Sequence, residues 1–439
     1  MNGVVTRPLT RNIDMSRGPC NVDQYQANGG YESLRLIGAG LIPGEMLQRV
    51  KDSGLKGRGG AGFPTGLKWS FVPMGENAPK QKYLVVNADE MEPGTFKDRL
   101  LMEGDPHLLI EGMIIAAYTI QASKAYIFLR GEYTAAEKAL KKAVWEAYRL
   151  GYLGKNIVGS GFDLDIVLHT SAGRYICGEE TALLNALEGK RANPRAKPPF
   201  PQVSGLWGKP TIVNNVETLC NLPGIISLGV DWYRGLTRGT DHGTKLFGVS
   251  GRVNRPGCWE LPLGTTIREV IEEHAGGMQT GYQLKAFLPG GGSTDFLLPE
   301  HLDLALDYDV IAKAGSRLAT GTMIVLDDRT CPVGMIGNLM KFFSHESCGW
   351  CTPCRDGLPW IDEIFRSLEK GTGNVTDLKI LHDHLGYLGP GRTFCALAPG
   401  AMAPLGSGLK YFKDEFDAHV RGKCCPYKAE PTGQIAGQG

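Results

Sequence analysis

The stretch Tyr83-Leu-Val-Val-Asn-Ala-Asp-Glu-Met-Glu-Pro-Gly94 decides the fold, because it joins an apolar strand to a polar turn. The apolar run over 83–87 has the length of a buried strand, and amide and acidic side chains follow it directly. Residues 107–120 then form a predicted apolar helix. Strands that alternate with helices indicate a parallel sheet, which binds ligands at the carboxyl ends of its strands. We therefore expect an α/β fold with a ligand site after residue 87.

The same alternation continues through the first half of the chain and predicts a Rossmann-like domain over residues 1–240. A polar lead-in over 1–55 is expected to end in a helix. The further predicted strands are 125–130 and 164–169, and the helices are 43–51, 134–150 and 178–187.

The pattern changes after residue 240. A hairpin at 245–251 and 258–261, a helix at 266–274 and strands at 284–288 and 322–326 predict a small β-grasp-like domain over 241–330. Beyond it, helical periodicity at 333–345, 358–370, 375–387 and 402–418 predicts a helical bundle over 331–439.

Composition excludes several classes of protein. The formal net charge of +1 gives no electrostatic footprint for nucleic acid. The most apolar run, 108–120, contains Glu111 and is too short to span a bilayer, so no direct membrane insertion is expected. The N-terminus lacks the apolar core of a secretory signal, and the eleven scattered cysteines favour a reducing, cytoplasmic compartment.

The glycine-rich loop Gly57-Arg-Gly-Gly-Ala-Gly62 contains a G-x-G-x-x-G string but follows polar residues rather than a strand. It is therefore not a standard Rossmann turn. Small residues still let backbone N–H groups approach a phosphate, and Arg58 and Lys68 would add positive charge. The alternative is a flexible surface loop.

Three further polar clusters, 87–94, 174–181 and 211–218, lie next to strands or helix starts. Asn87, Asp89, Asn214 and Asn215 are short polar groups that suit ribityl hydroxyls and the edges of a flavin. Other residues have ordinary structural alternatives. One of Glu179 and Glu180 could simply complement a helix dipole, and the stiff segment 197–201 could be a rigid connector. Phe63 and Phe71 have core residues as their ordinary alternative.

The segment Glu346-Ser-Cys-Gly-Trp-Cys-Thr-Pro-Cys-Arg355 holds Cys348, Cys351 and Cys354 at close spacing, and Cys395 follows at a distance. Three thiolates from one loop and a remote fourth are typical of a four-iron cubane cluster, hence of one-electron transfer. A four-thiolate zinc site fits this spacing less well but stays open. A disulfide framework is not expected at this cysteine density.

Five segments follow one another along the chain: the glycine loop, the 87–94 segment, Tyr175-Ile-Cys-Gly-Glu-Glu180, the Asn214–Asn215 pair and the cysteine loop. Taken in this order, they resemble the NADH-binding flavoprotein subunit of respiratory complex I. The resemblance runs roughly from Tyr31 to Tyr411. It implies a Rossmann-like domain, a β-grasp domain of the ubiquitin-like SLBB type and a helical bundle that carries a [4Fe-4S] cluster. Cys424 and Cys425 lie outside it and receive no role.

The resemblance also implies site residues. The FMN residues would be Gly57, Arg58, Gly59, Gly60, Lys68, Asn87, Asp89, Tyr175, Gly178, Glu179, Asn214, Asn215 and Thr218. The NADH residues would be Phe63, Phe71, Glu92, Glu180, Lys197 and Phe200. The cluster ligands would be Cys348, Cys351, Cys354 and Cys395. One departure is Met91, where many members have serine, and its side chain is expected to affect access to the flavin.

The implied activity is NADH:quinone oxidoreductase of the translocase class. Hydride passes from NADH to FMN, and single electrons then pass to the cluster, so no catalytic acid or base is expected. The implied partners are a two-iron thioredoxin-like subunit (E type) and a large multi-cluster subunit (G type), in the peripheral arm of an inner-membrane complex. Two alternatives remain: a diaphorase subunit of an NAD-linked hydrogenase or formate dehydrogenase, and a non-enzymatic scaffold with structural zinc.

Overall fold

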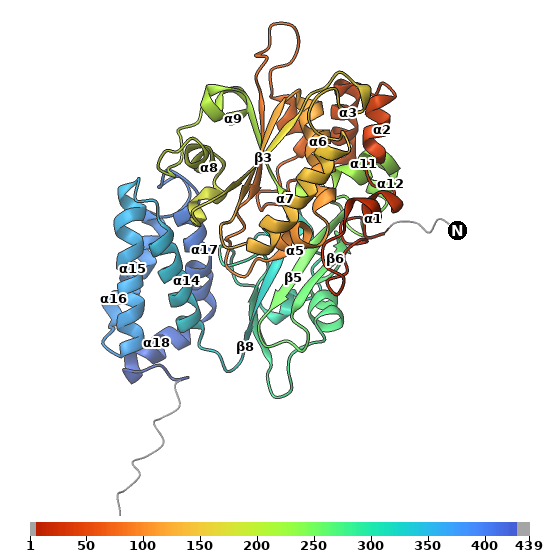
Figure 1. Cartoon of the computed structure of the whole chain (residues 1–439). Coiled ribbons are helices and arrows are strands. Elements are labelled where there is room, and N and C mark those ends of the chain that lie inside the picture. The colour runs from red at the N-terminus through yellow and green to blue at the C-terminus, as the bar shows by residue number, and fades with distance from the viewer. Residues whose placement is uncertain (1–5, 428–439) are drawn as a thin grey trace, which may run out of the picture.

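A computed structural model describes residues 6–427 and arranges them in three adjoining parts (Figure 1). The first is built on a four-stranded sheet in the order β3-β2-β1-β4, and all its neighbouring strands are parallel. Its strands are β1 (Tyr83–Ala88), β2 (Lys124–Leu129), β3 (Asp165–Thr170) and β4 (Thr211–Asn215). β4 is not among the strands predicted from the sequence. Its residues are interpreted in the sequence only as part of the polar cluster 211–218.

Both faces of this sheet are buried, because successive side chains of a strand point to opposite faces. Leu84 and Val86 pack into one core together with α6 (Pro106–Ile120) and α7 (Thr134–Arg149). Val85 packs into a second core with α8 (Glu180–Leu187) and the C-terminal helices. The sheet is therefore held between two hydrophobic cores.

The first part contains more helix than the sequence indicates. The lead-in is not merely polar, because Tyr25 of α1 and Leu34 of α2 are buried in the first core. The helices are α1 (Val22–Ala27), α2 (Glu32–Gly38), α3 (Pro43–Ser53), α4 (Thr65–Ser70), α5 (Lys97–Gly104), α9 (Pro201–Ser204), α10 (Val216–Cys220), α11 (Leu222–Leu228) and α12 (Val230–Arg234).

The second part has a sheet in the order β6-β5-β8-β7, made of β5 (Thr244–Ser250), β6 (Gly257–Pro262), β7 (Leu284–Leu288) and β8 (Thr322–Asp327). The predicted hairpin is confirmed, since β5 and β6 are antiparallel neighbours. The predicted helix is a wider π-type turn over Glu269–His274. One short helix, α13 (Tyr308–Lys313), precedes β8.

The third part is a helical bundle, seen at the left of Figure 1. It contains α14 (Pro332–Glu346), α15 (Thr352–Lys370), α16 (Val375–Tyr387), α17 (Leu397–Tyr411) and α18 (Lys413–Gly422). The single helix predicted over 402–418 is wrong. The chain breaks at Phe412, whose ring packs edge-on against Phe296 with 5.2 Å between ring centroids.

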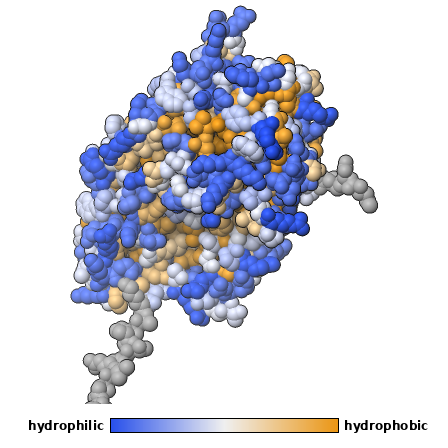
Figure 2. Space-filling view, viewed as in Figure 1, coloured by the Kyte–Doolittle hydropathy of each residue, from blue (hydrophilic) through white to orange (hydrophobic). Residues whose placement is uncertain are grey.

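The expected fold class is confirmed: a parallel α/β part, a small second sheet and a helical bundle. The face seen in Figure 2 is mostly hydrophilic, with apolar residues gathered in central patches. Within residues 6–427, none of the helices combines the length and the apolar content that a bilayer crossing requires.

Candidate functional site

A cavity of about 1140 Å³ lies at the carboxyl ends of β1 and β4. In the order β3-β2-β1-β4 the chain moves outward from β1 in both directions, so the boundary between β1 and β4 is the switch point where open sheets bind ligands. Asn87 and Asp89 reach the cavity from β1, and Asn214 and Asn215 reach it from β4. Its volume exceeds that of most single-ligand pockets, which leaves room for a flavin and a nicotinamide together.

Almost every residue expected to bind a cofactor lines this one cavity. From the flavin set these are Gly57, Gly59, Gly60, Lys68, Asn87, Asp89, Tyr175, Gly178, Glu179, Asn214, Asn215 and Thr218. From the nicotinamide set they are Phe63, Phe71, Glu92, Glu180, Lys197 and Phe200. The structure brings the residues together, and their individual roles stay predictions.

Arg58 is the exception. Its side chain is fully buried and does not line the cavity. One guanidinium nitrogen donates to Tyr233 Oη at 3.0 Å and to the His242 carbonyl at 2.8 Å, while the backbone N–H donates to Thr218 Oγ1 at 2.8 Å. Arg58 therefore ties the glycine loop to its support, and direct contact of its guanidinium with a phosphate in the cavity is not what the structure shows.

The glycine loop needs its small residues for close approach. A Cβ on Gly59 would lie 2.9 Å from Asn215 Cβ. Gly62 has a φ of +65°, and a Cβ there would lie 2.7 Å from the ring of Tyr308, a residue of α13. Tyr308 Oη also donates to the Gly57 carbonyl at 2.9 Å. Tyr308 of the second part thus packs against the glycine loop and restricts its conformation.

Asp89 is a buried carboxyl in the cavity wall, and one of its oxygens is unsatisfied. Its Oδ1 accepts a hydrogen bond from Ser171 Oγ at 2.8 Å, but its Oδ2 has no hydrogen-bond partner among the described residues. Burial raises the pKa of Asp89 to about 6. An orphaned buried oxygen is costly, so its presence in the cavity fits a polar ligand group that would satisfy it.

Glu92 is held rigidly by two donors. Tyr175 Oη donates to Glu92 Oε2 at 2.7 Å, and the Ser293 backbone N–H donates to Oε1 at 2.6 Å. Burial raises the pKa of Glu92 above its ordinary value. Tyr175 of the predicted flavin set is therefore in direct contact with Glu92 of the predicted nicotinamide set.

Two lysines and two glutamates form a compact group at the start of α8. Lys68 Nζ lies 2.8 Å from Glu180 Oε2, and Lys197 Nζ lies 2.9 Å from Glu179 Oε1. Burial acts to raise the pKa of Glu180, but Lys68 and Lys197 outweigh burial and the pKa lies below its ordinary value. Glu179 Oε2 also accepts the Thr181 and Ala182 N–H groups, so it caps α8 as the alternative interpretation suggests.

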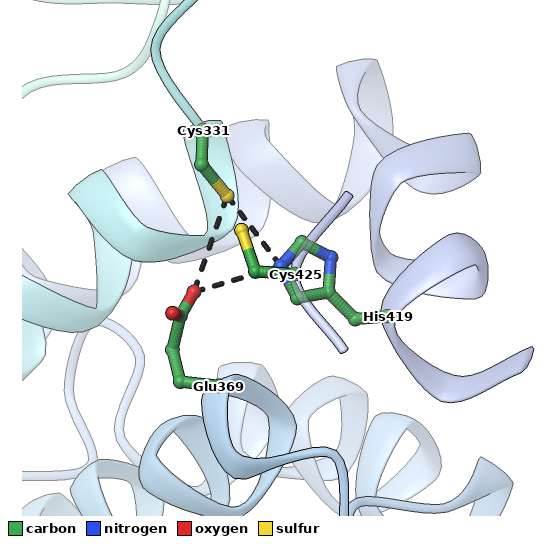
Figure 3. Close-up of side chains that lie close together, drawn as sticks. All are labelled: Cys331, Glu369, His419 and Cys425. Carbon is green, nitrogen blue, oxygen red and sulfur yellow. Dashed lines mark hydrogen bonds and ion pairs between the residues drawn. The ribbon is translucent and has the colours of Figure 1, made fainter. Parts of the chain in front are cut away.

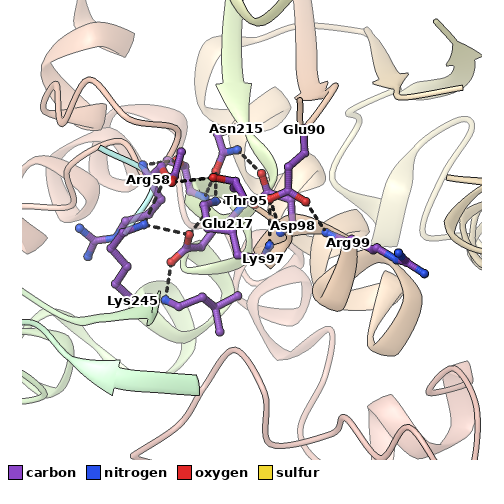
Figure 4. A network of polar contacts seen from close by, with 12 residues as sticks. Arg58, Glu90, Thr95, Lys97, Asp98, Arg99, Asn215, Glu217 and Lys245 are labelled. Carbon is purple, nitrogen blue, oxygen red and sulfur yellow. Dashed lines mark hydrogen bonds and ion pairs between the residues drawn. The ribbon is translucent and has the colours of Figure 1, made fainter. Parts of the chain in front are cut away.

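A network of buried charges includes Lys97 and Asp98 of the cavity wall (Figure 4). Lys97 Nζ lies 2.7 Å from Asp98 Oδ1 and 2.8 Å from Glu217 Oε2, and Lys245 Nζ lies 3.3 Å from the same Glu217 oxygen. Burial would lower the pKa of Lys97, but attraction to Asp98 and Glu217 raises it above its ordinary value. Burial lowers the pKa of Lys245 to about 8. Since Lys245 belongs to β5, this network joins the two sheets.

The four predicted cluster cysteines come together at one end of the bundle. Cys348 and Cys351 lie in the loop between α14 and α15, Cys354 lies in the first turn of α15, and Cys395 lies just before α17. Burial, and then the nearby thiols of the other three, raises the pKa of Cys354 to about 12. A thiol whose ionisation is opposed by neighbouring thiols fits a cationic metal centre, whose charge makes thiolates favourable.

The cysteine loop is attached to the cavity. Cys395 itself lines the cavity, and Glu346 Oε2 at the end of α14 accepts the Tyr175 backbone N–H at 2.9 Å. Arg191 donates to the Cys348 carbonyl at 3.1 Å. One of the four predicted cluster ligands therefore forms part of the cavity wall.

Sequence reasoning missed the lining residues of the second part, Ser293, Arg317 and Thr320. They belong to no motif, because they reach the cavity only through the packing of the two sheets. Met91, the departure noted in the sequence, is half-buried and lines the cavity, so its apolar side chain does face any ligand there.

Comparison with known families gives three matches that follow the three parts. Residues 50–224 match the Nuo51 FMN-binding domain, residues 246–296 match the SLBB domain, and residues 334–419 match the NADH-ubiquinone oxidoreductase-F iron-sulfur binding region.

Individual relatives agree with these matches. The chain is 56% identical over 416 residues to the F-type subunit of NADH-quinone oxidoreductase from Escherichia coli (strain K12), a match that covers 95% of this chain and 93% of that protein. It is 50% identical to the corresponding protein of Mycobacterium tuberculosis, with 94% and 93% covered.

Among solved structures, a crystal structure of an NAD⁺-reducing [NiFe]-hydrogenase in the H₂-reduced state matches with a TM-score of 0.78 at 37% identity. The match covers 88% of this chain but only 63% of the hydrogenase chain. The hydrogenase chain is therefore the longer of the two, and the similarity concerns one portion of it.

Proposed function

The chain belongs to the family of F-type subunits of NADH-quinone oxidoreductase, and from this premise we propose that its large cavity receives FMN and the nicotinamide of NADH side by side. Members of this family are the NADH-oxidising, electron-input subunits of complex I, with FMN and a [4Fe-4S] cluster. One observation supports the proposal above all: the polar groups at the strand ends and Cys395 line the same cavity.

The flavin end lies at the glycine loop and the ends of β1 and β4. The backbone of Gly59 and Gly60 receives the phosphate, and the buried charge of Arg58 supports the loop from behind. Asn87, Asp89 and Asn215 offer short polar side chains to the ribityl chain and the ring edge. The remaining predicted flavin residues line the same end.

The nicotinamide end lies at the exposed aromatic residues. Phe63, Phe71 and Phe200 are all exposed while lining the cavity, so their rings are available to stack on a planar ligand. Glu92 and Glu180, each held by its own partners, orient the ribose and the carboxamide.

When bound, FMN takes the hydride of NADH and releases electrons singly to a one-electron cluster. The side chains contribute position, exclusion of water and fixed charge, because none of those lining the cavity is required as an acid or base for hydride transfer. Cys348, Cys351, Cys354 and Cys395 hold the cluster against the cavity wall. The structural-zinc alternative does not account for the flavin-type cavity beside these thiols.

Partner subunits of complex I are expected to dock over the cysteine loop. Trp350 and Phe394 flank the cluster ligands, are both exposed, and lie 6.3 Å apart between ring centroids. Exposed aromatic pairs of this kind are frequent anchors of interfaces. We assign this surface to the two-iron E-type subunit or the multi-cluster G-type subunit, in a peripheral arm on the cytoplasmic side of the inner membrane.

Replacement of one cluster ligand tests the proposal. Cys351→Ser should keep bound FMN and NADH oxidation by ferricyanide within about twofold, because neither depends on the cluster. Electron delivery to the partner subunits should fall by at least about tenfold. Cys424→Ser, at an exposed cysteine away from the loop, is the matched control. Undiminished delivery by Cys351→Ser would contradict the proposed route.

Colour provides the test of the cofactors themselves. The visible absorption spectrum of the anaerobically purified chain should contain a flavin band and a broad iron–sulfur shoulder. The flavin band should bleach when NADH is added. A colourless protein that stays colourless after addition of FMN would overturn the proposed function.

A further inference from the structure

We propose that Cys331, Glu369, His419 and Cys425 form a second metal site, which binds one zinc ion and closes the far end of the helical bundle. The four side chains converge from separate segments (Figure 3). Cys331 precedes α14, Glu369 lies in the last turn of α15, His419 belongs to α18, and Cys425 follows α18. All four potential ligand atoms lie within 4.8 Å of one another.

The spacing of these atoms matches a tetrahedral ion. Cys331 Sγ lies 3.5 Å from His419 Nε2 and 4.0 Å from Glu369 Oε1, and His419 Nε2 lies 3.5 Å from Glu369 Oε1. Ligands at zinc bond lengths of about 2.0–2.3 Å in a tetrahedron are separated by roughly 3.3–3.8 Å. The cluster is therefore close to zinc-binding dimensions without rearrangement of the helices.

The ligands are also oriented for a metal. His419 Nδ1 lies 2.6 Å from the Glu415 carbonyl, so it donates there and leaves the lone pair of Nε2 directed at the cluster. The Gly334 backbone N–H donates to Cys331 Sγ at 3.2 Å, at the N-terminus of α14, where a helix favours negative charge on sulfur. These second contacts fix the donor atoms in the way that metal ligands are usually fixed.

The ligand set selects zinc among common ions. Two thiolates and an imidazole are soft or borderline donors that calcium and magnesium avoid, and zinc accepts them together with a carboxylate. Four protein ligands leave no open position, so the site is structural rather than catalytic. Binding releases the thiol protons to solvent, with no change of oxidation state.

This site is separate from the four cysteines that hold the cluster. Cys331 lies before the start of α14, and Cys348 lies after its end. A helix of 15 residues is roughly 22 Å long, so the two sites stand at opposite ends of the bundle. Zinc at the far end would join α14, α15 and α18 to the segment that follows α18.

Metal analysis of the full-length protein tests the proposal. The chain is purified without an affinity tag, dialysed against EDTA, and its zinc, iron and flavin contents are measured together. About one zinc per chain should remain, since structural sites of this kind hold zinc tightly. Zinc X-ray absorption should show two sulfur and two lighter neighbours. Absence of zinc, or iron held by these residues instead, would overturn the assignment.

Matched variants locate the ion. Cys425→Ser and His419→Ala should lower zinc retention by at least about tenfold while flavin and cluster iron stay unchanged. Cys424→Ser changes the adjacent, exposed thiol and should keep all the zinc. Because Cys425 follows the last helix, its replacement leaves the bundle core intact. Equal zinc in Cys425→Ser and Cys424→Ser, or a Cys331–Cys425 disulfide in the intact mass of the purified protein, would refute the site.

Discussion

At the residue scale, several cavity-lining side chains are each positioned by a specific hydrogen-bond or ion-pair partner. Tyr175 Oη holds Glu92, Ser171 Oγ holds Asp89, and Lys68 holds Glu180. Loss of one partner should therefore affect ligand binding through the residue it positions.

Tyr175→Phe tests this dependence. It removes the hydroxyl that donates to Glu92 Oε2 and leaves the hydrogen bond from the Ser293 N–H to Oε1 in place. A hydrogen bond to a charged group contributes about 1.5–3 kcal/mol, so KM for NADH should rise roughly tenfold. Steady-state kinetics with ferricyanide measure this, and Tyr387→Phe, at an exposed tyrosine, is the control. An unchanged KM would separate Glu92 from nicotinamide binding.

Asp89 should make the stability of the flavin-free chain depend on pH. Burial raises its pKa to about 6, so the folded chain binds more protons than the unfolded chain between the ordinary value of 3.8 and about 6. Stability conferred by the neutral carboxyl is present at low pH and falls as pH rises through that window. Asp89→Asn should thus be more stable than the parent chain at pH 7 by up to about 3 kcal/mol, and equally stable near pH 4.

Urea unfolding at both pH values measures the difference for Asp89→Asn. Asp356→Asn replaces an exposed aspartate and should follow the parent chain throughout. A constant offset of Asp89→Asn at both pH values would show that the carboxyl does not titrate in this window.

The sequence predicted which residues gather at the cavity better than it predicted where their side chains point. The glycine loop correctly marked a cavity wall, because small residues there permit the close approach of Asn215 and Tyr308. Arg58 could not be predicted, since its direction depends on Tyr233 and His242, far away in the sequence. The same holds for Cys425, which meets Cys331 only after the whole bundle has folded.

At the scale of elements, segments of continuous apolar character were predictable, whereas β4 was not. β1 and α6 have continuous apolar character, whereas β4 is five residues long and ends in two asparagines. Its place in the sheet depends on pairing with β1, which a local pattern does not contain. The break between α17 and α18 was hidden for a similar reason, because Phe412 is apolar enough to continue the helical period.

Glu217 on α10 links elements of both sheets and provides the test at this scale. It pairs with Lys97 and Lys245, and its Oε1 accepts the Leu246 N–H of β5 at 2.8 Å. Glu217→Gln removes the negative charge that pairs with the buried ammonium groups of Lys97 and Lys245. The free energy of unfolding should therefore fall by about 3 kcal/mol or more. Glu137→Gln, which breaks an exposed pair on α7, should cost at most about 0.5 kcal/mol.

Chemical denaturation of holo-protein measures both glutamine variants. Equal effects of Glu217→Gln and Glu137→Gln would show that the buried network adds no more than a surface pair.

At the scale of the whole molecule, the exposed aromatic pair beside the cluster predicts how the protein couples to its neighbours. Trp350→Ala should leave NADH–ferricyanide activity and cluster content unchanged, because its side chain is exposed and lies outside the cavity. Loss of an aromatic anchor should weaken binding to the partner subunits by about 2 kcal/mol, or roughly thirtyfold in Kd. Trp145→Ala on α7, equally exposed but on the first part, is the control. Equal affinities of the two variants would place the interface elsewhere.

The cavity itself has a consequence for how the protein is made. Its wall takes Gly57 from the first part, Ser293 and Arg317 from the second, and Cys395 and Gly400 from the bundle. A nascent chain emerging from the ribosome therefore has no complete cavity until nearly all of it has been synthesised. Completion of the cavity is therefore a late step of biogenesis, and chains that end with α16 lack Cys395 and should emerge without iron–sulfur colour even where their first sheet has already folded.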